Sequence, residues 1–270
     1  MKDQYFGDVN DFRKYGLLRV LVIKARLRLG VCWMRTDSDG GTDGRFLDYL
    51  NEPAKCRHRD PELFDWLKQV VGDQHDRRTA RIEASSLLGG AVFQSCILTD
   101  SATDRRSYFH DCAARFDGPD LVFFDPDNGI EVKSRPRGHK DSSKFLYWDE
   151  IFPFWNRGSS LLIYQHFPRQ NREDYTANLA SRLQQRIQSA AVFCFRTANV
   201  LFLLASQARH ANHFRECLDQ VRAAWHPDIV GSEYAFSRSE NRSDEFSIEM
   251  VEEPAGLLFQ QYDTEESGQS

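Results

Sequence analysis

Short apolar runs that end in polar residues are the clearest pattern along the chain. Residues 29–34, 121–124 and 160–164 are almost wholly apolar, and each run passes directly into polar residues. Continuous apolar runs of this length are typical of strands covered on both faces, as in a parallel sheet. The run at 121–124 is bounded by Asp120 on one side and Asp125-Pro126 on the other. We therefore expect three buried strands whose polar ends lie at one edge of a sheet.

Between these runs, apolar residues recur with the spacing of helices. Asp11 is suited to cap the first helix, and Pro61 suits the first turn of the second. The helices are expected at residues 12–29, 61–71, 103–116, 148–155, 173–188 and 213–224. A further strand is expected at 92–98, and residues 192–195 and 200–204 indicate an antiparallel hairpin. The fold class is thus α/β: a mostly parallel Rossmann-like sheet flanked by helices, with an antiparallel hairpin near the end.

Composition and charge narrow the class of protein. Hydrophobic residues make up 41% and charged residues 28%, as in an ordinary globular chain, and we expect one domain over residues 1–263 with a disordered tail at 264–270. The net charge of −5 argues against a uniformly basic surface. No apolar run reaches the roughly 18 residues of a membrane helix, and no secretory signal is recognisable. The six cysteines form no CxxC pair and suit buried thiols, so a cytoplasmic protein without a membrane association is expected.

The segment Asp125-Pro126-Asp127-Asn128 carries the strongest chemical signal. Pro126 fixes its own φ and holds the preceding residue extended, so a strand must stop there. A rigid turn can then hold two carboxylates and an amide together, although the same residue types also suit an ordinary turn. His166 ends another predicted strand. Because ligands bind beyond the carboxyl ends of parallel strands, we predict Asp125, Asp127, Asn128 and His166 as catalytic residues.

Two further segments are rich in polar residues and glycine. Residues 37–45 contain three glycines and several aspartates, which would repel a pyrophosphate but accept hydrogen bonds from ribose hydroxyls or an amino group; a flexible surface loop is the alternative. Residues 5–15 place polar groups just before the first helix, where they suit either a site or a solvated first turn.

The order of these segments resembles class I S-adenosylmethionine-dependent methyltransferases. Residues 7–15 read GDVNDFRKY, a loop with Gly40 to Arg45 follows the first strand, and LVFFDP ends at Pro126. The pattern is most similar to the bacterial large-subunit ribosomal RNA adenine methyltransferases, over roughly residues 5–206. The resemblance implies that Lys14, Asp37 and the loop to Gly44 hold S-adenosylmethionine. The candidate cofactor-binding residues are therefore Asp11, Lys14, Asp37, Gly40, Gly41 and Gly44. The resemblance also implies that Asp125 accepts a hydrogen bond from an exocyclic amine of a base in RNA or DNA.

The sequence departs from that family at two positions. Asp127 and Asn128 stand where the family's Asp-Pro-Pro-Tyr motif has its second proline and its aromatic residue, so the stacking surface for a flipped base is missing there. Tyr147, Trp148 and Phe167 are the candidates to replace it. The stretch with Arg135, Arg137, His139, Lys140 and Lys144 suits either contacts with phosphates or a solvated loop.

Two other functions fit the sequence. Asp120, Glu131 and Lys133 match the spacing of a PD…ExK nuclease, in which paired strands from residues 121 to 133 would bind Mg²⁺. A non-catalytic module of a defence or mobile-element cassette is the third hypothesis, because family residues are replaced. The observation that best separates the first two hypotheses is whether Asp37, Asp125 and His166 line a common pocket, or whether Asp120, Glu131 and Lys133 cluster instead.

Overall fold

The computed structural model describes residues 1–37, 44–73, 76–189, 191–237 and 247–250. Its strands are β1 (Leu29–Cys32), β2 (Val92–Gln94), β3 (Leu121–Phe124), β4 (Gly129–Ile130), β5 (Phe145–Leu146), β6 (Ser160–His166), β7 (Ala191–Arg196), β8 (Val200–Ser206), β9 (Val230–Ser237) and β10 (Ser247–Met250). Its α-helices are α1 (Val9–Val22), α2 (Pro53–Cys56), α3 (Pro61–Leu67), α4 (Ala80–Glu83), α5 (Ala102–Arg115), α6 (Trp148–Asn156), α7 (Arg172–Ile187) and α8 (Ala211–Trp225). The predicted tail at 264–270 lies outside the described residues.

Eight strands form one sheet in the order β10-β9-β7-β8-β6-β3-β1-β2. Strands β2, β1, β3 and β6 pair in parallel, and β8 and β9 run against the direction of the others. The α/β class, the mostly parallel sheet and the β7–β8 hairpin predicted from the sequence are confirmed. Within the sheet, β8 lies between β6 and β7, and the sheet continues beyond the hairpin through β9 and β10, which were not predicted.

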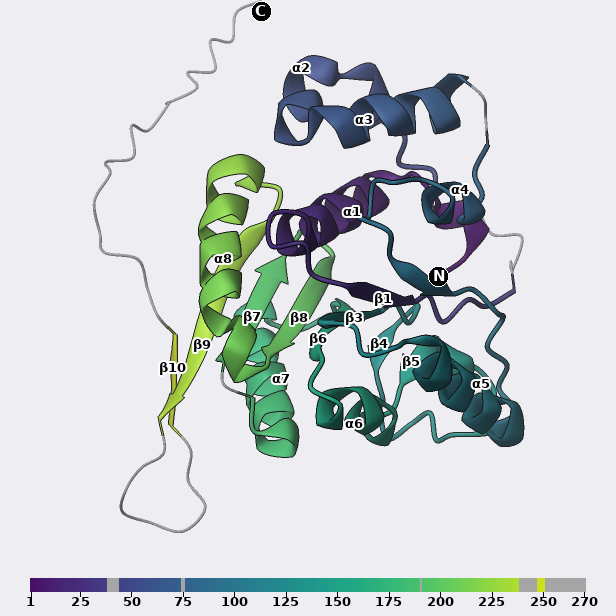
Figure 1. Ribbon diagram of the computed structural model, residues 1–270, viewed down its shortest axis with the longest axis vertical. Coiled ribbons are helices and arrows are strands. Elements are labelled where there is room, and N and C mark those ends of the chain that lie inside the picture. The colour runs from purple at the N-terminus through teal and green to yellow at the C-terminus, as the bar shows by residue number, and fades with distance from the viewer. Residues whose placement is uncertain (38–43, 74–75, 190, 238–246, 251–270) are drawn as a thin grey trace, which may run out of the picture.

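Helices cover both faces of this sheet (Figure 1). Helices α1, α3 and α8 lie over one face, and α5, α6 and α7 lie over the other. Strand β3 shows why both faces are apolar: Leu121 and Phe123 pack into the first core, whereas Val122 and Phe124 pack into the second. A strand whose successive side chains enter two cores must be apolar throughout, as the unbroken run at this position indicated.

Helix α1 differs from its prediction at both ends. Asp8, not Asp11, caps it: the Asp8 carboxylate accepts hydrogen bonds from the backbone nitrogens of Asn10 and Asp11 at 2.8 and 3.0 Å. The helix ends at Val22 rather than at residue 29, and Arg26 then adopts a left-handed φ of 51° as the chain turns into β1. The earlier cap brings the side chains of the first turn to the carboxyl edge of the sheet.

The chain reverses its direction of winding between β1 and β3. It passes from β1 to β2 on one side and later returns to β3 on the other side of β1. In open α/β sheets, such a switch point leaves a crevice beyond the carboxyl ends of the two strands.

Among the described residues, no helix is long and apolar enough to cross a membrane.

Candidate functional site

A cavity of about 510 Å³ opens at the switch point, within the range typical of small-molecule sites. The turn after β3 contributes Asp125, Asp127 and Asn128, and the end of β6 contributes His166. The predicted residues Asp11, Lys14 and Gly44 also line it. The lining residues not singled out from the sequence as site residues are Met1, Lys2, Tyr5, Asp8, Asn10, Phe46, Pro126, Lys144, Tyr164, Asn199 and Val200.

The other predicted site residues lie elsewhere. Asp37 is exposed and is absent from the cavity lining, which corrects its expected place beside Asp125 and His166. Gly40 and Gly41 lie outside the described residues. The aromatic residues proposed to replace the missing ring at Asn128 do not line the cavity either. Tyr147 lies between two guanidinium groups, Trp148 packs against Arg182 and Arg186, and Phe167 packs against Tyr175 and Arg172.

A buried ion cluster forms the floor of the cavity. The ammonium of Lys14 lies 2.7 Å from Asp11 Oδ1 and 2.8 Å from Asp125 Oδ2, and all three side chains are almost fully buried. Burial lowers the pKa of Lys14, but the two carboxylates outweigh it and raise the pKa above its ordinary value. Lys14 therefore stays charged and holds the Asp125 carboxylate in place.

The two carboxyl groups of the β3 turn differ in their electrostatics. Burial raises the pKa of Asp125, although Lys14 and the Met1 ammonium act in the opposite direction. Burial acts the same way on Asp127, yet the Met1 ammonium and the Thr36 hydroxyl, which donates to Asp127 at 2.7 Å, bring the pKa of Asp127 below its ordinary value. Asp127 is thus a fixed anion, whereas Asp125 is the carboxyl group whose charge depends on Lys14.

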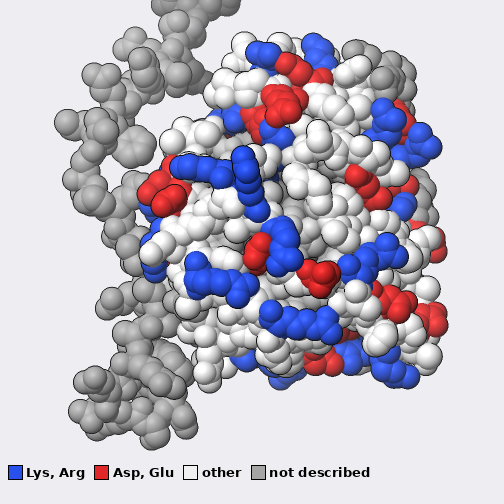
Figure 2. All heavy atoms as spheres, in the orientation of Figure 1, with Lys and Arg blue, Asp and Glu red and all other residues white. Residues whose placement is uncertain are grey.

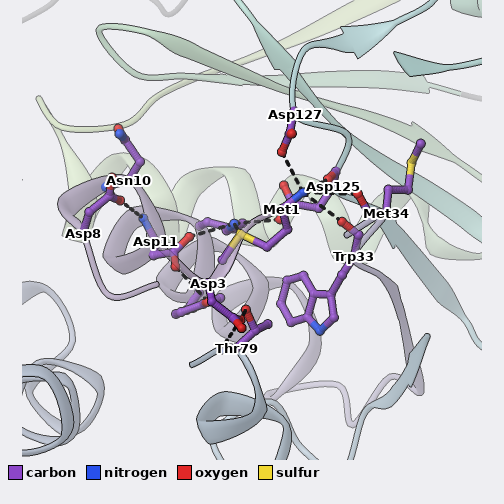
Figure 3. A network of polar contacts seen from close by, with 12 residues as sticks. Met1, Asp3, Asp8, Asn10, Asp11, Trp33, Met34, Thr79, Asp125 and Asp127 are labelled. Atoms are coloured by element: carbon purple, nitrogen blue, oxygen red, sulfur yellow. Dashed lines mark hydrogen bonds and ion pairs between the residues drawn. The ribbon is translucent and has the colours of Figure 1, made fainter. Parts of the chain in front are cut away.

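The Met1 ammonium marks an ammonium-binding position between β1 and β3 (Figure 3). It donates to the carbonyl oxygens of Trp33, Met34 and Asp125 at 3.2, 3.3 and 3.2 Å, and to Asp127 Oδ1 at 2.8 Å. Three carbonyls and a carboxylate from the ends of two neighbouring strands thus converge on one point. This set of acceptors suits a primary ammonium, because every polar atom in it accepts and none donates.

The carboxamide of Gln165 holds the turn after β3 through hydrogen bonds to its backbone. Its Oε1 accepts a hydrogen bond from the Ile130 nitrogen at 2.9 Å, and its Nε2 donates to the carbonyls of Asn128 and His166 at 3.1 and 2.9 Å. Gly129 has a φ of 117°, and a Cβ there would lie 2.3 Å from Gln165 Oε1. The turn and the end of β6 are therefore one hydrogen-bonded unit that holds Asn128 and His166 side by side.

Asp8 is a titratable group of this cavity that was not among the predicted site residues. Burial, followed by repulsion from Asp11, raises the pKa of Asp8 from 3.8 to about 6. The folded chain then binds this proton more tightly than the unfolded chain. The stability that this protonation contributes is present at low pH and is lost as the pH rises from about 3.8 to about 6.

We expect an Asp8→Asn variant to be more stable than the wild type above pH 6, because asparagine caps a helix equally well without a buried charge. The difference in unfolding free energy should grow to on the order of 2 kcal/mol between pH 4 and pH 7. Urea denaturation of both proteins across this range measures it. A difference that stays constant with pH would contradict the assignment.

The arrangement required by the nuclease hypothesis is absent. Strand β3 pairs in parallel with β1 and β6 and forms no hairpin with β4, which pairs with β5 instead. Asp120 lies at the amino end of β3, where it accepts from the Arg28 nitrogen at 2.9 Å, while Glu131 lies beyond the carboxyl end beside Leu146. Within the described parts of the chain, no group of three or more His, Cys, Asp or Glu side chains is placed to hold a metal ion.

At the opposite edge of the sheet, Ser160, His210 and Asp120 form a Ser-His-Asp arrangement that is not a catalytic triad. Ser160 Oγ lies 2.9 Å from His210 Nδ1, and Asp120 Oδ1 lies 3.8 Å from His210 Nε2. Arg209 donates to His210 Nε2, so the histidine proton lies on Nδ1 and points at the serine. Ser160 is fully buried and cannot give its proton to a histidine that donates to it, so it is no nucleophile.

Acidic and basic side chains are interspersed on the face seen in Figure 2, so that face has no continuous basic surface. Of the basic stretch predicted to meet phosphates, Lys144 lines the cavity, and it pairs with Asp141 at 2.9 Å. Arg137 pairs with Asp149 on the surface instead.

Comparisons with known proteins leave the family open. No family model matches the chain, and no curated protein matches it. Among solved structures, protein LPL1258 from Legionella pneumophila str. Philadelphia 1, described by the family model DUF519, aligns over 91% of this chain and 97% of its own. The two are 12% identical with a TM-score of 0.41, a likeness too low to support a functional argument.

Proposed function

We propose that the protein binds S-adenosylmethionine in this cavity and transfers its methyl group to an exocyclic amine of a nucleic-acid base. The observation that carries the proposal is the set of acceptors at the switch point, where the Trp33, Met34 and Asp125 carbonyls and the Asp127 carboxylate converge on one ammonium. The carboxylic side chains of the cavity share it with the cationic groups of Met1, Lys2, Lys14 and Lys144, so the lining is of mixed charge. S-adenosylmethionine carries an ammonium that these acceptors suit.

The groups that hold Met1 fit the amino-acid part of this donor. An α-ammonium already occupies the position between the Trp33, Met34 and Asp125 carbonyls and Asp127. The donor carries the same group, and its ammonium would take the place of the Met1 nitrogen. Lys14 contacts the Met1 sulfur at 3.5 Å, so the thioether of Met1 lies beside the floor of the cavity, near the carboxyl groups proposed to act on the target.

Asp125 is positioned to act on the target amine. Its Oδ2 accepts from Lys14, whereas no residue that the structure describes donates to its Oδ1. We assign to Oδ1 a hydrogen bond from the amine, which increases the nucleophilicity of the nitrogen. When bound, the donor would supply an electrophilic methyl group. The nitrogen would gain a C–N bond as the C–S bond breaks, the electron pair of that bond would stay on the sulfur of the thioether product, and the nitrogen would lose its proton to the Asp125 carboxylate.

Binding is the first test. We expect S-adenosylmethionine to stabilise the full chain by about 2.7 kcal/mol at a hundred times its dissociation constant, which corresponds to a rise in Tm of roughly 5–10 °C. Calorimetric titration should give one site per chain, and ATP, an adenosine without an α-ammonium, should not bind. Binding of ATP without S-adenosylmethionine would refute the proposal. Transfer is then measured with a tritiated methyl group and total RNA or denatured DNA.

A non-catalytic ligand-binding role is the second candidate. Two observations favour it: Met1 fills the ammonium position, and Asn128 stands where the resembling family has an aromatic residue. The same two measurements separate the candidates. Stoichiometric binding of the donor without transfer to any nucleic acid would support the binding role.

A further inference from the structure

One aromatic ring stands exposed at the cavity. Phe46 is 64% exposed, the highest value among the exposed large hydrophobic side chains of the described residues. Its backbone is nevertheless fixed, because its carbonyl accepts a hydrogen bond from the Val9 nitrogen at 3.0 Å at the start of α1. An exposed ring on an anchored backbone, lining a cavity, offers a flat apolar surface to a ligand.

Polar side chains also line this cavity. Asn128, His166 and Asn199 are all exposed and all line it. Their backbones are tied together: the His166 nitrogen donates to the Asn128 carbonyl at 3.2 Å, and the Phe167 nitrogen donates to the Asn199 carbonyl at 3.1 Å. These side chains, which we name the amide wall (Asn128, His166 and Asn199), present two carboxamides and an imidazole, which together can donate and accept hydrogen bonds.

We propose that Phe46 is the stacking surface for the target base, and that the amide wall contacts the polar edge of that base. The inference rests on the proposed function and assigns its substrate contacts. A planar ring stacked on Phe46 and bonded at its edge by carboxamides is held as a nucleobase requires. Phe46 thereby takes the place of the aromatic ring that is missing at Asn128, and Tyr147, Trp148 and Phe167 do not.

Stacking can be measured apart from methyl transfer. A single-stranded oligonucleotide with one central 2-aminopurine should lose fluorescence on binding to the full chain, because stacking quenches this base. We expect Phe46→Ala to weaken binding about 5- to 100-fold and to abolish the quenching, since a base–aromatic stack contributes in this range. Phe46→Trp should retain both. Ile23→Ala, which truncates a side chain that is 42% exposed and lines a different cavity, should change neither.

An oligonucleotide that is abasic at the central position completes the test. It should bind the wild type and Phe46→Ala equally, because it has no base to stack. Unchanged quenching in Phe46→Ala, or no binding of the oligonucleotide to the wild type, would overturn the stacking proposal. Phe46-dependent quenching together with no binding of S-adenosylmethionine would instead refute the proposed function while stacking stands.

Discussion

Replacing Asp125 with asparagine is expected to reduce methyl transfer roughly 10²- to 10⁴-fold, the contribution typical of a positioned acid or base. Asparagine keeps the size of the side chain and can still accept a hydrogen bond from Lys14, which lies 2.8 Å from the Asp125 carboxylate. It loses the negative charge that polarises the target amine. The rate of tritium transfer at saturating donor and nucleic acid measures the effect.

Asp120→Asn is the matched control, because Asp120 lies at the amino end of the same strand, next to Arg28 and away from the cavity. It should leave the transfer rate within a few-fold of the wild type. Asp120→Asn should melt within a few degrees of the wild type, whereas Asp125→Asn removes one carboxylate of the buried cluster and should melt lower, so the transfer rates are compared at a temperature at which both variants are folded. Equal losses in the two variants would assign the effect to the strand and not to the site.

Replacing Lys14 with methionine should destabilise the fold by about 3–5 kcal/mol, the usual cost of removing one partner from a buried ion pair. Lys14 is 4% exposed and pairs with Asp11 and Asp125, so the variant leaves two carboxylates buried without their cation. Denaturation in urea at pH 7 measures the loss.

The pH dependence of this variant gives an internal check. Unpaired carboxyl groups have raised pKa values in the folded state, so the variant should recover stability as the pH falls and these groups take up protons. Lys144→Met is the control: Lys144 lines the same cavity, is 33% exposed, pairs with Asp141, and should cost less than about 1 kcal/mol. Adding Asp125→Asn to Lys14→Met should restore part of the loss. A cost below 1 kcal/mol for Lys14→Met would show that the cluster is not a stabilising element.

The buried strands and the turn after β3 were predictable because their signals are local. Leu121–Phe124 could be recognised as a strand without its neighbours, since four apolar residues between Asp120 and Asp125-Pro126 fit little else. The position of His166 beside this turn followed from the rule that parallel strands end at one edge. Whether these residues act in catalysis remains a prediction.

The place of Phe46 at the cavity was not predictable, because long-range contacts determine it. Asp3 holds the amino-terminal segment through Arg35 at 2.8 Å and through Thr79 at 2.7 Å, partners 32 and 76 positions away. Arg77 joins the same segment to the loop before Phe46 by donating to the Phe6 and Gly44 carbonyls. No periodicity in the sequence encodes such contacts, so Phe46 attracted no attention there. Asp8 was hidden for a different reason: the apolar pattern starts at residue 12, and the cap lies one turn earlier.

The close approach of Gly129 to Gln165 restricts how this cavity can be reshaped. Any side chain at position 129 would collide with the carboxamide that holds the turn, so neither residue can change alone without moving Asn128. Attempts to widen the pocket for larger ligands, or to alter its selectivity, should therefore begin at Phe46, whose side chain can be trimmed or enlarged without disturbing the hydrogen-bonded frame. In a directed-evolution library, we expect accepted substitutions to concentrate at position 46 and to avoid positions 129 and 165.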